Sequence, residues 1–197
     1  MKKEAFIKKG SIYFVTFCNY LRIFYSMNRM DPKAETQAIV ECKTDLASFA
    51  KLYDAYVKDV YRYVYSRLGN KTETEDITSE TFLKAIEKFS SYKHEDGKTI
   101  KWWLFAIARN LMIDKFRKKE MLEFNEEYTA WHDEKILDAI ADRDQITKIE
   151  EFIKTFKPPV PEIIQLRLWE ELSFDEISKI VGKPTASIKM AYYRALE

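Results

Sequence analysis

The chain has 197 residues, of which 46% are apolar and 33% charged, a composition typical of globular domains rather than of disordered segments. Its four glycines and five prolines disfavour an all-β fold and leave no glycine-rich loop that could hold phosphates. Two cysteines and two histidines, far apart in the sequence, predict neither a disulfide framework nor a metal site, and they fit a reducing cytoplasm. We therefore expect an all-α protein that is not an enzyme and has no cofactor, no catalytic residues and no small-molecule substrate.

Residues 1–43 differ in character from the rest of the chain. Lysines precede an apolar run at 12–21, which is shorter than the roughly 20 residues that a membrane-spanning helix needs. We interpret 1–43 as an N-terminal extension, with Met27 or Met30 as a possible alternative start. A helix that binds a partner or a membrane surface is the other interpretation.

Strong helical periodicity begins at residue 44. Thr44 or Asp45 can cap a first helix, and Gly69 is the kind of residue that ends one in the left-handed conformation. Thr72 and Glu75 match a capping box that would open a second helix. The predicted helices are 44–69, 72–91 and, after a loop at 92–98, 99–119.

Basic and acidic residues are segregated along the chain, although the formal net charge is only +1. Bases dominate residues 98–119, acids dominate 120–151, and the last stretch is again basic. This pattern favours two nucleic-acid-binding regions separated by an acidic linker, which we assign to 121–144.

Cations and aromatic rings alternate in the predicted helix 99–119 and in the loop before it. Such a mixture suits unpaired DNA, because the cations hold phosphates while the rings receive splayed bases. Trp103 has the helical spacing of a core residue, so Trp102 is the better candidate for a surface ring. The candidate contacts are Tyr92, His94, Trp102, Arg109, Asn110, Lys115 and Arg117.

The stretch 172–196 has the pattern of a helix-turn-helix. Ser173 can cap its first helix, Gly182 allows the tight turn, and Thr185 or Ser187 can open the second helix. That second helix would offer polar and aromatic side chains to a major groove, namely Lys189, Tyr192, Tyr193 and Arg194. A helical hairpin with a solvated basic face is the alternative. The charged outer side of helix 72–91 is likewise either a solvated surface or a docking surface.

Three stretches together resemble region 2 of the sigma-70 family, in its extracytoplasmic-function variant: Phe49–Asp54 with Val60–Tyr63, Glu75–Ala85 and Trp103–Arg117. Residues 145–197 resemble region 4 of the same family. The resemblance implies two small helical domains, a three- to four-helix region 2 domain at 44–120 and a helix-turn-helix region 4 domain at 145–197.

The function implied by this resemblance is that of a sigma factor. Such a subunit binds core RNA polymerase in the cytoplasm, directs it to promoters and helps melt the −10 region, and an anti-sigma factor is a further expected partner. A stand-alone helix-turn-helix regulator of transcription is the alternative.

The resemblance also assigns residues to each role. The polymerase-binding residues are Asp76, Glu80, Phe82 and Leu83. The residues for the melted −10 element are Tyr92, Lys93, Trp102, Arg109, Asn110, Lys115 and Arg117. The residues for the duplex −35 element are Thr185, Ser187, Lys189, Tyr193 and Arg194. Met190 and Ala191 depart from the family, which commonly has a small polar and a basic residue there.

Overall fold

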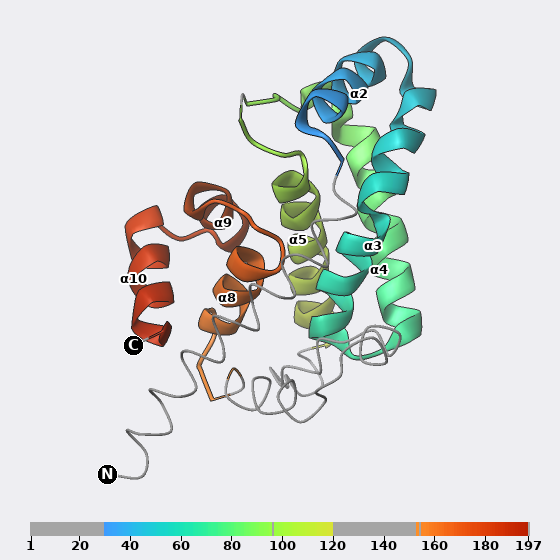
Figure 1. Cartoon of the computed structure of the whole chain (residues 1–197). Helices are drawn as coiled ribbons and strands as arrows, with labels where there is room; N and C mark the ends of the chain where they lie inside the picture. Colours follow the sequence, from blue (N-terminus) through green and yellow to red (C-terminus); the bar gives the residue numbers. More distant parts are fainter. Residues whose placement is uncertain (1–29, 96, 120–152, 154, 197) are drawn as a thin grey trace, which may run out of the picture. The chain divides into compact units, whose positions relative to one another are not determined.

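The computed structural model describes residues 30–95, 97–119, 153 and 155–196. The chain divides into two compact units, one spanning Met30–Asp133 and the other containing the described residues from 153 onward. Every described element is helical, which confirms the predicted all-α class (Figure 1). None of the described helices is long and apolar enough to cross a membrane. The predicted linker 121–144 and most of the N-terminal extension lie outside the described residues.

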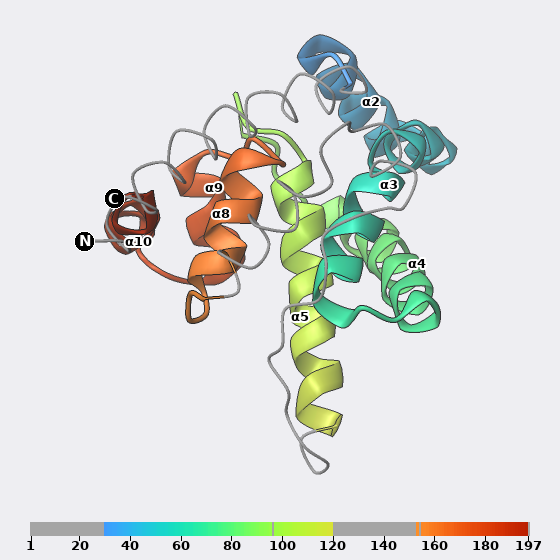
Figure 2. The ribbon, with the colours of Figure 1, turned by 60° about the horizontal axis from the view of Figure 1, so that its bottom comes forward.

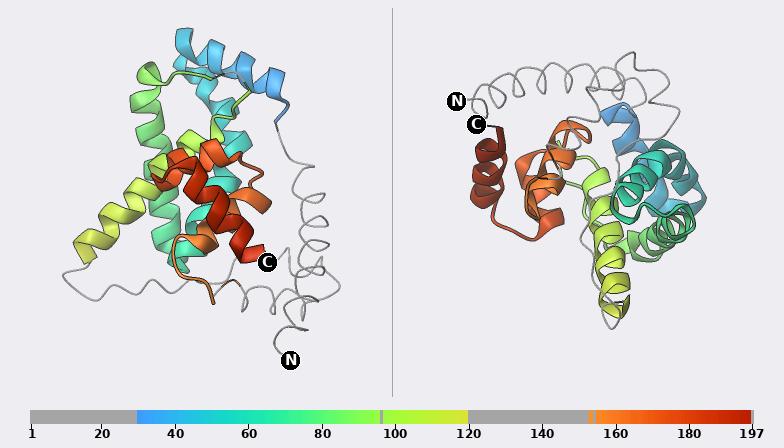
Figure 3. Two further views of the ribbon diagram at one scale, coloured as in Figure 1. Left: turned by 90° about the vertical axis from the view of Figure 1, so that its left-hand side faces the viewer. Right: turned by 90° about the horizontal axis from the view of Figure 1, so that it is seen from below.

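The described residues of the first unit form four α-helices. α3, α4 and α5 pack side by side, and α2 lies across one end of them against α3 (Figures 1 and 3). The C-terminal turns of α5 extend past α3 and α4 (Figure 2). The helices are α2 (Pro32–Thr44), α3 (Phe49–Leu68), α4 (Lys71–Lys88) and α5 (Lys101–Lys119), with short 3-10 turns η1 (Leu46–Ser48) and η2 (Phe89–Ser91).

The core of this unit is apolar and aromatic. Tyr63 of α3 stacks on Phe105 of α5, with ring centroids 4.6 Å apart and planes inclined by 14°. Phe49 meets Phe89 edge-on at 5.6 Å. Aliphatic side chains fill the remaining space, and the fully buried ones include Leu52, Val60, Val64 and Leu104.

Residues that the sequence analysis placed in the extension form α2. Asp31 caps this helix, because its carboxylate accepts hydrogen bonds from the Lys33 N–H at 3.0 Å and the Ala34 N–H at 3.2 Å. The buried side of α2, which includes Ile39 and Cys42, packs against α3. The compact unit therefore begins before residue 44.

The starts of the next helices also differ from the sequence prediction. The Asn70 side chain accepts a hydrogen bond from the Glu73 N–H at 3.0 Å, so α4 begins at Lys71 and the predicted capping box of Thr72 and Glu75 is wrong. Asparagine is among the strongest N-cap residues, and here it directly follows the end of α3. That end is as predicted, at Gly69 with a φ of 59°. α5 begins at Lys101, two residues later than expected.

The second unit contains the predicted helix-turn-helix. α8 (Val160–Leu168) precedes α9 (Phe174–Val181) and α10 (Thr185–Leu196). Ser173 and Glu176 cap α9 reciprocally, and Gly182, with a φ of 72°, ends it. Ser173 and Gly182 confirm the sequence-based assignment of this turn, whereas the sequence analysis did not single out Glu176.

We predict that Phe105→Ala lowers the free energy of unfolding of the first unit by about 3–5 kcal/mol, because it removes a fully buried ring and leaves a cavity beneath Tyr63. Urea unfolding followed by circular dichroism measures the change. Leu83→Ala, at a side chain with 61% exposure, is the control and should shift stability by no more than about 0.5 kcal/mol. Equal effects of the two variants would contradict the assigned core.

Candidate nucleic-acid interface

The outer side of α4 carries an acidic stripe with one exposed leucine. Asp76, Glu80 and Leu83 are spaced by four and three residues, so they share one helical face, and all three are exposed. Glu80 pairs with Lys84 at 3.0 Å on the same helix. Phe82 points inward instead, with its ring 4.8 Å from that of Tyr53 and 6.5 Å from that of Phe49. Three of the four predicted polymerase-binding residues therefore share a surface, and Phe82 supports it from the core.

Helix geometry divides the predicted contacts on α5 into two groups. At 3.6 residues per turn, one arc of about 100° contains Trp102, Arg109, Asn110 and Arg117. Asn110 and Arg117 are exposed, whereas Trp102 and Arg109 are half-buried. Lys115 lies on roughly the opposite side, where its Nζ is 3.5 Å from the Glu73 carboxylate of α4. The structure thus groups four predicted residues and separates the fifth.

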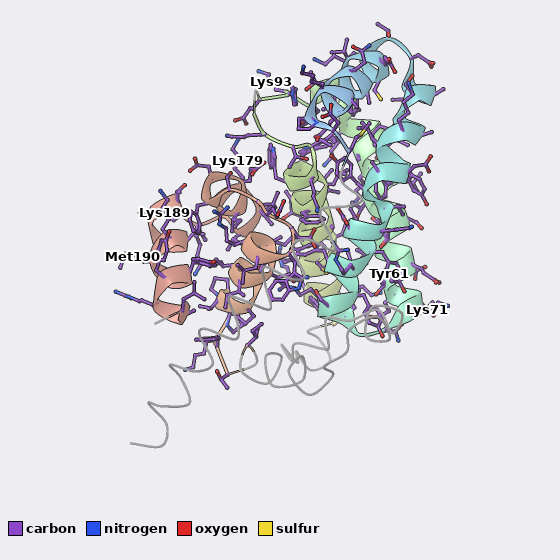
Figure 4. All side chains as sticks on the ribbon, viewed as in Figure 1. Tyr61, Lys71, Lys93, Lys179, Lys189 and Met190 are labelled. Carbon is purple, nitrogen blue, oxygen red and sulfur yellow. The ribbon has the colours of Figure 1, made fainter. Side chains whose placement is uncertain are left out.

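In the loop before α5, Tyr92 is buried and Lys93 is exposed. Tyr92 is only 5% exposed, and its ring lies 4.7 Å from Trp103 and 6.0 Å from Phe89. It is therefore not on a surface from which it could stack on a base. Lys93 is exposed on the loop (Figure 4). His94, on the other hand, contacts α2 through Thr36, with Nε2 3.5 Å from the hydroxyl oxygen.

The exposed face of α10 centres on Met190. Ser187, Tyr193 and Arg194 flank this methionine within one arc, and Lys189 lies at its edge. Met190 and Tyr193 are 52% and 56% exposed, and in Figure 4 Lys189 and Met190 point away from α8 and α9. The sequence analysis treated Met190 only as a departure from the family, although its helical angle relative to Arg194 could have placed it on this face.

The inner side of α10 is fixed to α9. The Thr185 hydroxyl donates to the Asp175 carboxylate at 2.9 Å and ties the start of α10 to the preceding helix. The Phe174 ring lies 5.4 Å from that of Tyr192, which is 8% exposed. The expectation that Tyr192 is available to a groove is therefore wrong, because its ring completes the packing between the two helices.

A partly buried ion cluster holds the first turn of α5. Asp59 of α3 accepts from Lys101 Nζ at 2.6 Å and from the Arg62 guanidinium at 2.9 Å. Burial, the largest single influence, pushes the pKa of Asp59 upward, but the two cations together outweigh it and hold that pKa below its ordinary value. Lys101 is thus a structural cation and not part of the exposed basic face.

Comparison with known proteins identifies the family. The model of Sigma-70 region 2 matches residues 52–121. The ECF RNA polymerase sigma factor BldN of Streptomyces coelicolor is 34% identical over 158 residues, which cover 76% of this chain and 58% of that protein. Residues 52–121 therefore belong to the Sigma-70 region 2 family, and the chain is similar to extracytoplasmic-function sigma factors over three quarters of its length. The ECF RNA polymerase sigma factor SigW of Bacillus subtilis is 28% identical over 167 residues, or 79% of this chain and 88% of that protein.

A solved structure agrees with the fold of this chain. The sigma factor RpoE of Bartonella quintana, in complex with the anti-sigma factor NepR, matches with a TM-score of 0.60 and 22% identity. The match covers 75% of this chain and 91% of that one. Together with the helical elements described above, it supports the all-α, two-domain architecture.

We predict that Asp59→Asn destabilises the first unit at pH 6 and that this loss shrinks on acidification. A carboxyl whose pKa is lowered by folding contributes stability above its unfolded pKa, near 4, and loses it as pH falls through the folded value. Urea unfolding at pH 6, 4 and 3 measures the gap between variant and wild type. Asp54→Asn, on the exposed side of α3, controls for replacing a carboxylate by an amide. A gap that stays constant over this range would contradict the assigned role of Asp59.

Proposed function

We propose that this chain is a sigma subunit that binds core RNA polymerase, directs it to promoters and helps melt the −10 region, without catalytic chemistry of its own. The match of Sigma-70 region 2 to residues 52–121 carries the proposal. A stand-alone regulator would account for α8–α10 but gives no reason for a region 2 unit. The proposed site of action of the sigma subunit is the cytoplasm, where polymerase and promoters meet.

The domain assignment follows from this function. Region 2 lies in the unit that begins at Met30, region 4 at 145–197, and residues 121–144 link them. The first unit docks on polymerase through the acidic stripe of α4. An exposed leucine among carboxylates suits a partner surface with an apolar pocket and a basic rim, and such a central apolar anchor often carries much of the binding energy.

The exposed arc of α5 and the preceding loop are the proposed site for the melted −10 strand. Lys93 and Arg117 supply positive charge for phosphates, and Asn110 supplies an exposed amide that can hydrogen-bond to a splayed base. Trp102, half-buried beside them, is the ring available for stacking. Tyr92 and Lys115 support this surface from behind, through the core and through Glu73.

The exposed face of α10 is the proposed reader of the duplex −35 element. A helix of this kind fits the major groove, where side chains reach base edges and phosphates. Arg194 and Lys189 provide charge, while Met190 provides an apolar contact of the type that recognises a thymine methyl group. Thr185 holds the helix at the required angle to α9.

An anti-sigma factor is the further proposed partner. The related RpoE of Bartonella quintana is known in complex with such a protein. A partner of this kind would hold the sigma subunit away from polymerase, and the exposed leucine of α4 is an obvious part of the surface to cover.

Pull-down with bacterial core polymerase, followed by run-off transcription on a promoter library, tests the proposal. We predict that the wild-type chain binds and yields promoter-specific transcripts, whereas Leu83→Ala weakens core binding about tenfold because it removes the exposed apolar anchor. Leu46→Ala, at another exposed leucine of the same unit, is the matched control. Absence of core binding by the wild type would refute the sigma function and favour the stand-alone regulator.

We predict that Lys189→Ala combined with Arg194→Ala weakens transcription from −35-dependent promoters and leaves core binding intact. Removing two phosphate-facing cations should also reduce the slope of log affinity against log salt by about 2. Fluorescence anisotropy with holoenzyme and promoter duplex measures both effects. Lys157→Ala removes an exposed cation ahead of α8 as the control. Simultaneous loss of DNA and core binding would contradict the separate role of α10.

A further inference from the structure

Glu35 of α2 is a buried acid whose partners all lie outside its own helix. Only 5% of this residue is exposed. Its Oε2 accepts from the Tyr56 hydroxyl at 2.7 Å, and its Oε1 accepts from the Thr99 hydroxyl at 3.0 Å and from the Ile100 N–H. One carboxylate thus joins α2, α3 and the segment that leads into α5.

The start of α5 depends on this carboxylate for its cap. Ile100 directly precedes the helix and has no side-chain oxygen that could accept from an N-terminal N–H group. Thr99 satisfies the Lys101 N–H, at 3.3 Å, and Glu35 satisfies the Ile100 N–H. A negative charge is also favourable at the positive end of a helix dipole.

Helix α2 contacts the loop 92–98 within its length and directly after its end. Thr36, next to Glu35 in α2, contacts His94 within the loop, and Glu35 itself binds the residues that follow the loop. In Figure 1 the loop passes beside α2 before it enters α5. α2 does not need Glu35 for its own attachment, because Ala38, Ile39 and Cys42 are buried on its inner side. Loss of the carboxylate should therefore release the loop and the start of α5 while α2 stays docked.

We propose that Glu35 is a positioning residue for promoter melting: without touching DNA, it fixes the loop 92–98 and the first turn of α5, and so the orientation of Trp102 and Lys93. The proposal rests on the sigma function proposed above. It predicts that changes at Glu35 affect capture of the melted −10 strand and not docking on polymerase, since the acidic stripe lies on α4.

The test uses the full chain reconstituted with core polymerase. Glu35→Gln keeps the shape of the side chain but replaces one acceptor oxygen by an NH₂ group that cannot accept the bonds of its neighbours. We expect open-complex formation, measured by permanganate reactivity of −10 thymines, to fall about tenfold, with core affinity within about twofold of wild type. Asn110→Ala, at the proposed contact surface, is the positive control for loss of opening.

Glu41→Gln is the matched control on the same helix. Its carboxylate pairs at the surface with Lys51 at 2.7 Å, so it tests the loss of a charge from α2 without the buried contacts. Hydrogen exchange adds a readout that does not depend on transcription. In Glu35→Gln we expect faster exchange over 93–103 and unchanged protection of 36–43.

The outcomes separate the two proposals. The sigma function is refuted if the wild-type chain does not assemble with core polymerase into a holoenzyme and no promoter is opened. A functional wild type with normal opening by Glu35→Gln overturns the positioning role, as does a variant that loses opening and core binding in equal measure. If Glu35→Gln does not fold, Tyr56→Phe tests the positioning role instead, because it removes one hydrogen bond to the Glu35 carboxylate and keeps the aromatic ring. A smaller loss of opening with normal core binding is then expected, and wild-type behaviour overturns the proposal.

Discussion

The first turn of α5 is the point on which the first unit depends. Two acids from different helices meet it: the buried Glu35 of α2 binds the backbone at Ile100, and the half-buried Asp59 of α3 binds the Lys101 ammonium. Each contact satisfies a group that would be costly to bury alone. Because the loop 92–98 enters α5 here, the same two contacts set the position of the residues proposed to hold single-stranded DNA.

This arrangement changes how the charges of the chain are understood. The basic stretch 98–119 looks uniform in the sequence, but Lys101 and Lys115 are paired with acids of α3 and α4. Their charges are largely neutralised inside the unit and contribute little to an attractive field for DNA. The exposed basic residues, such as Lys93 and Arg117, therefore carry the electrostatic part of the proposed −10 site, and the overall charge of +1 says little about it.

Local signals made much of the fold predictable. Gly69, Ser173 and Gly182 act on neighbouring residues, so their caps can be deduced from short windows of sequence. Glu35 could not be found in this way, because its partners are 21 and 64 residues away in the chain. The burial of Tyr92 was equally out of reach, because this residue lies outside the helices, where no periodicity applies, and the rings of Phe89 and Trp103 that pack against it come from other elements.

The division into two units has a consequence for promoter recognition. Each unit has a core of its own: Glu35 and Asp59 fix the start of α5 in the first unit, and Phe174 and Asp175 fix α10 in the second. Energetic effects at sites without shared partners are usually additive. Under the proposed assignment, reading of the −35 duplex and capture of the −10 strand can therefore be altered separately, and a substitution on α10 that changes sequence preference need not weaken melting. The acidic stripe of α4 belongs to the same unit as the proposed −10 site, so the proposed docking and opening surfaces share one packed unit, whereas the proposed −35 surface belongs to the other.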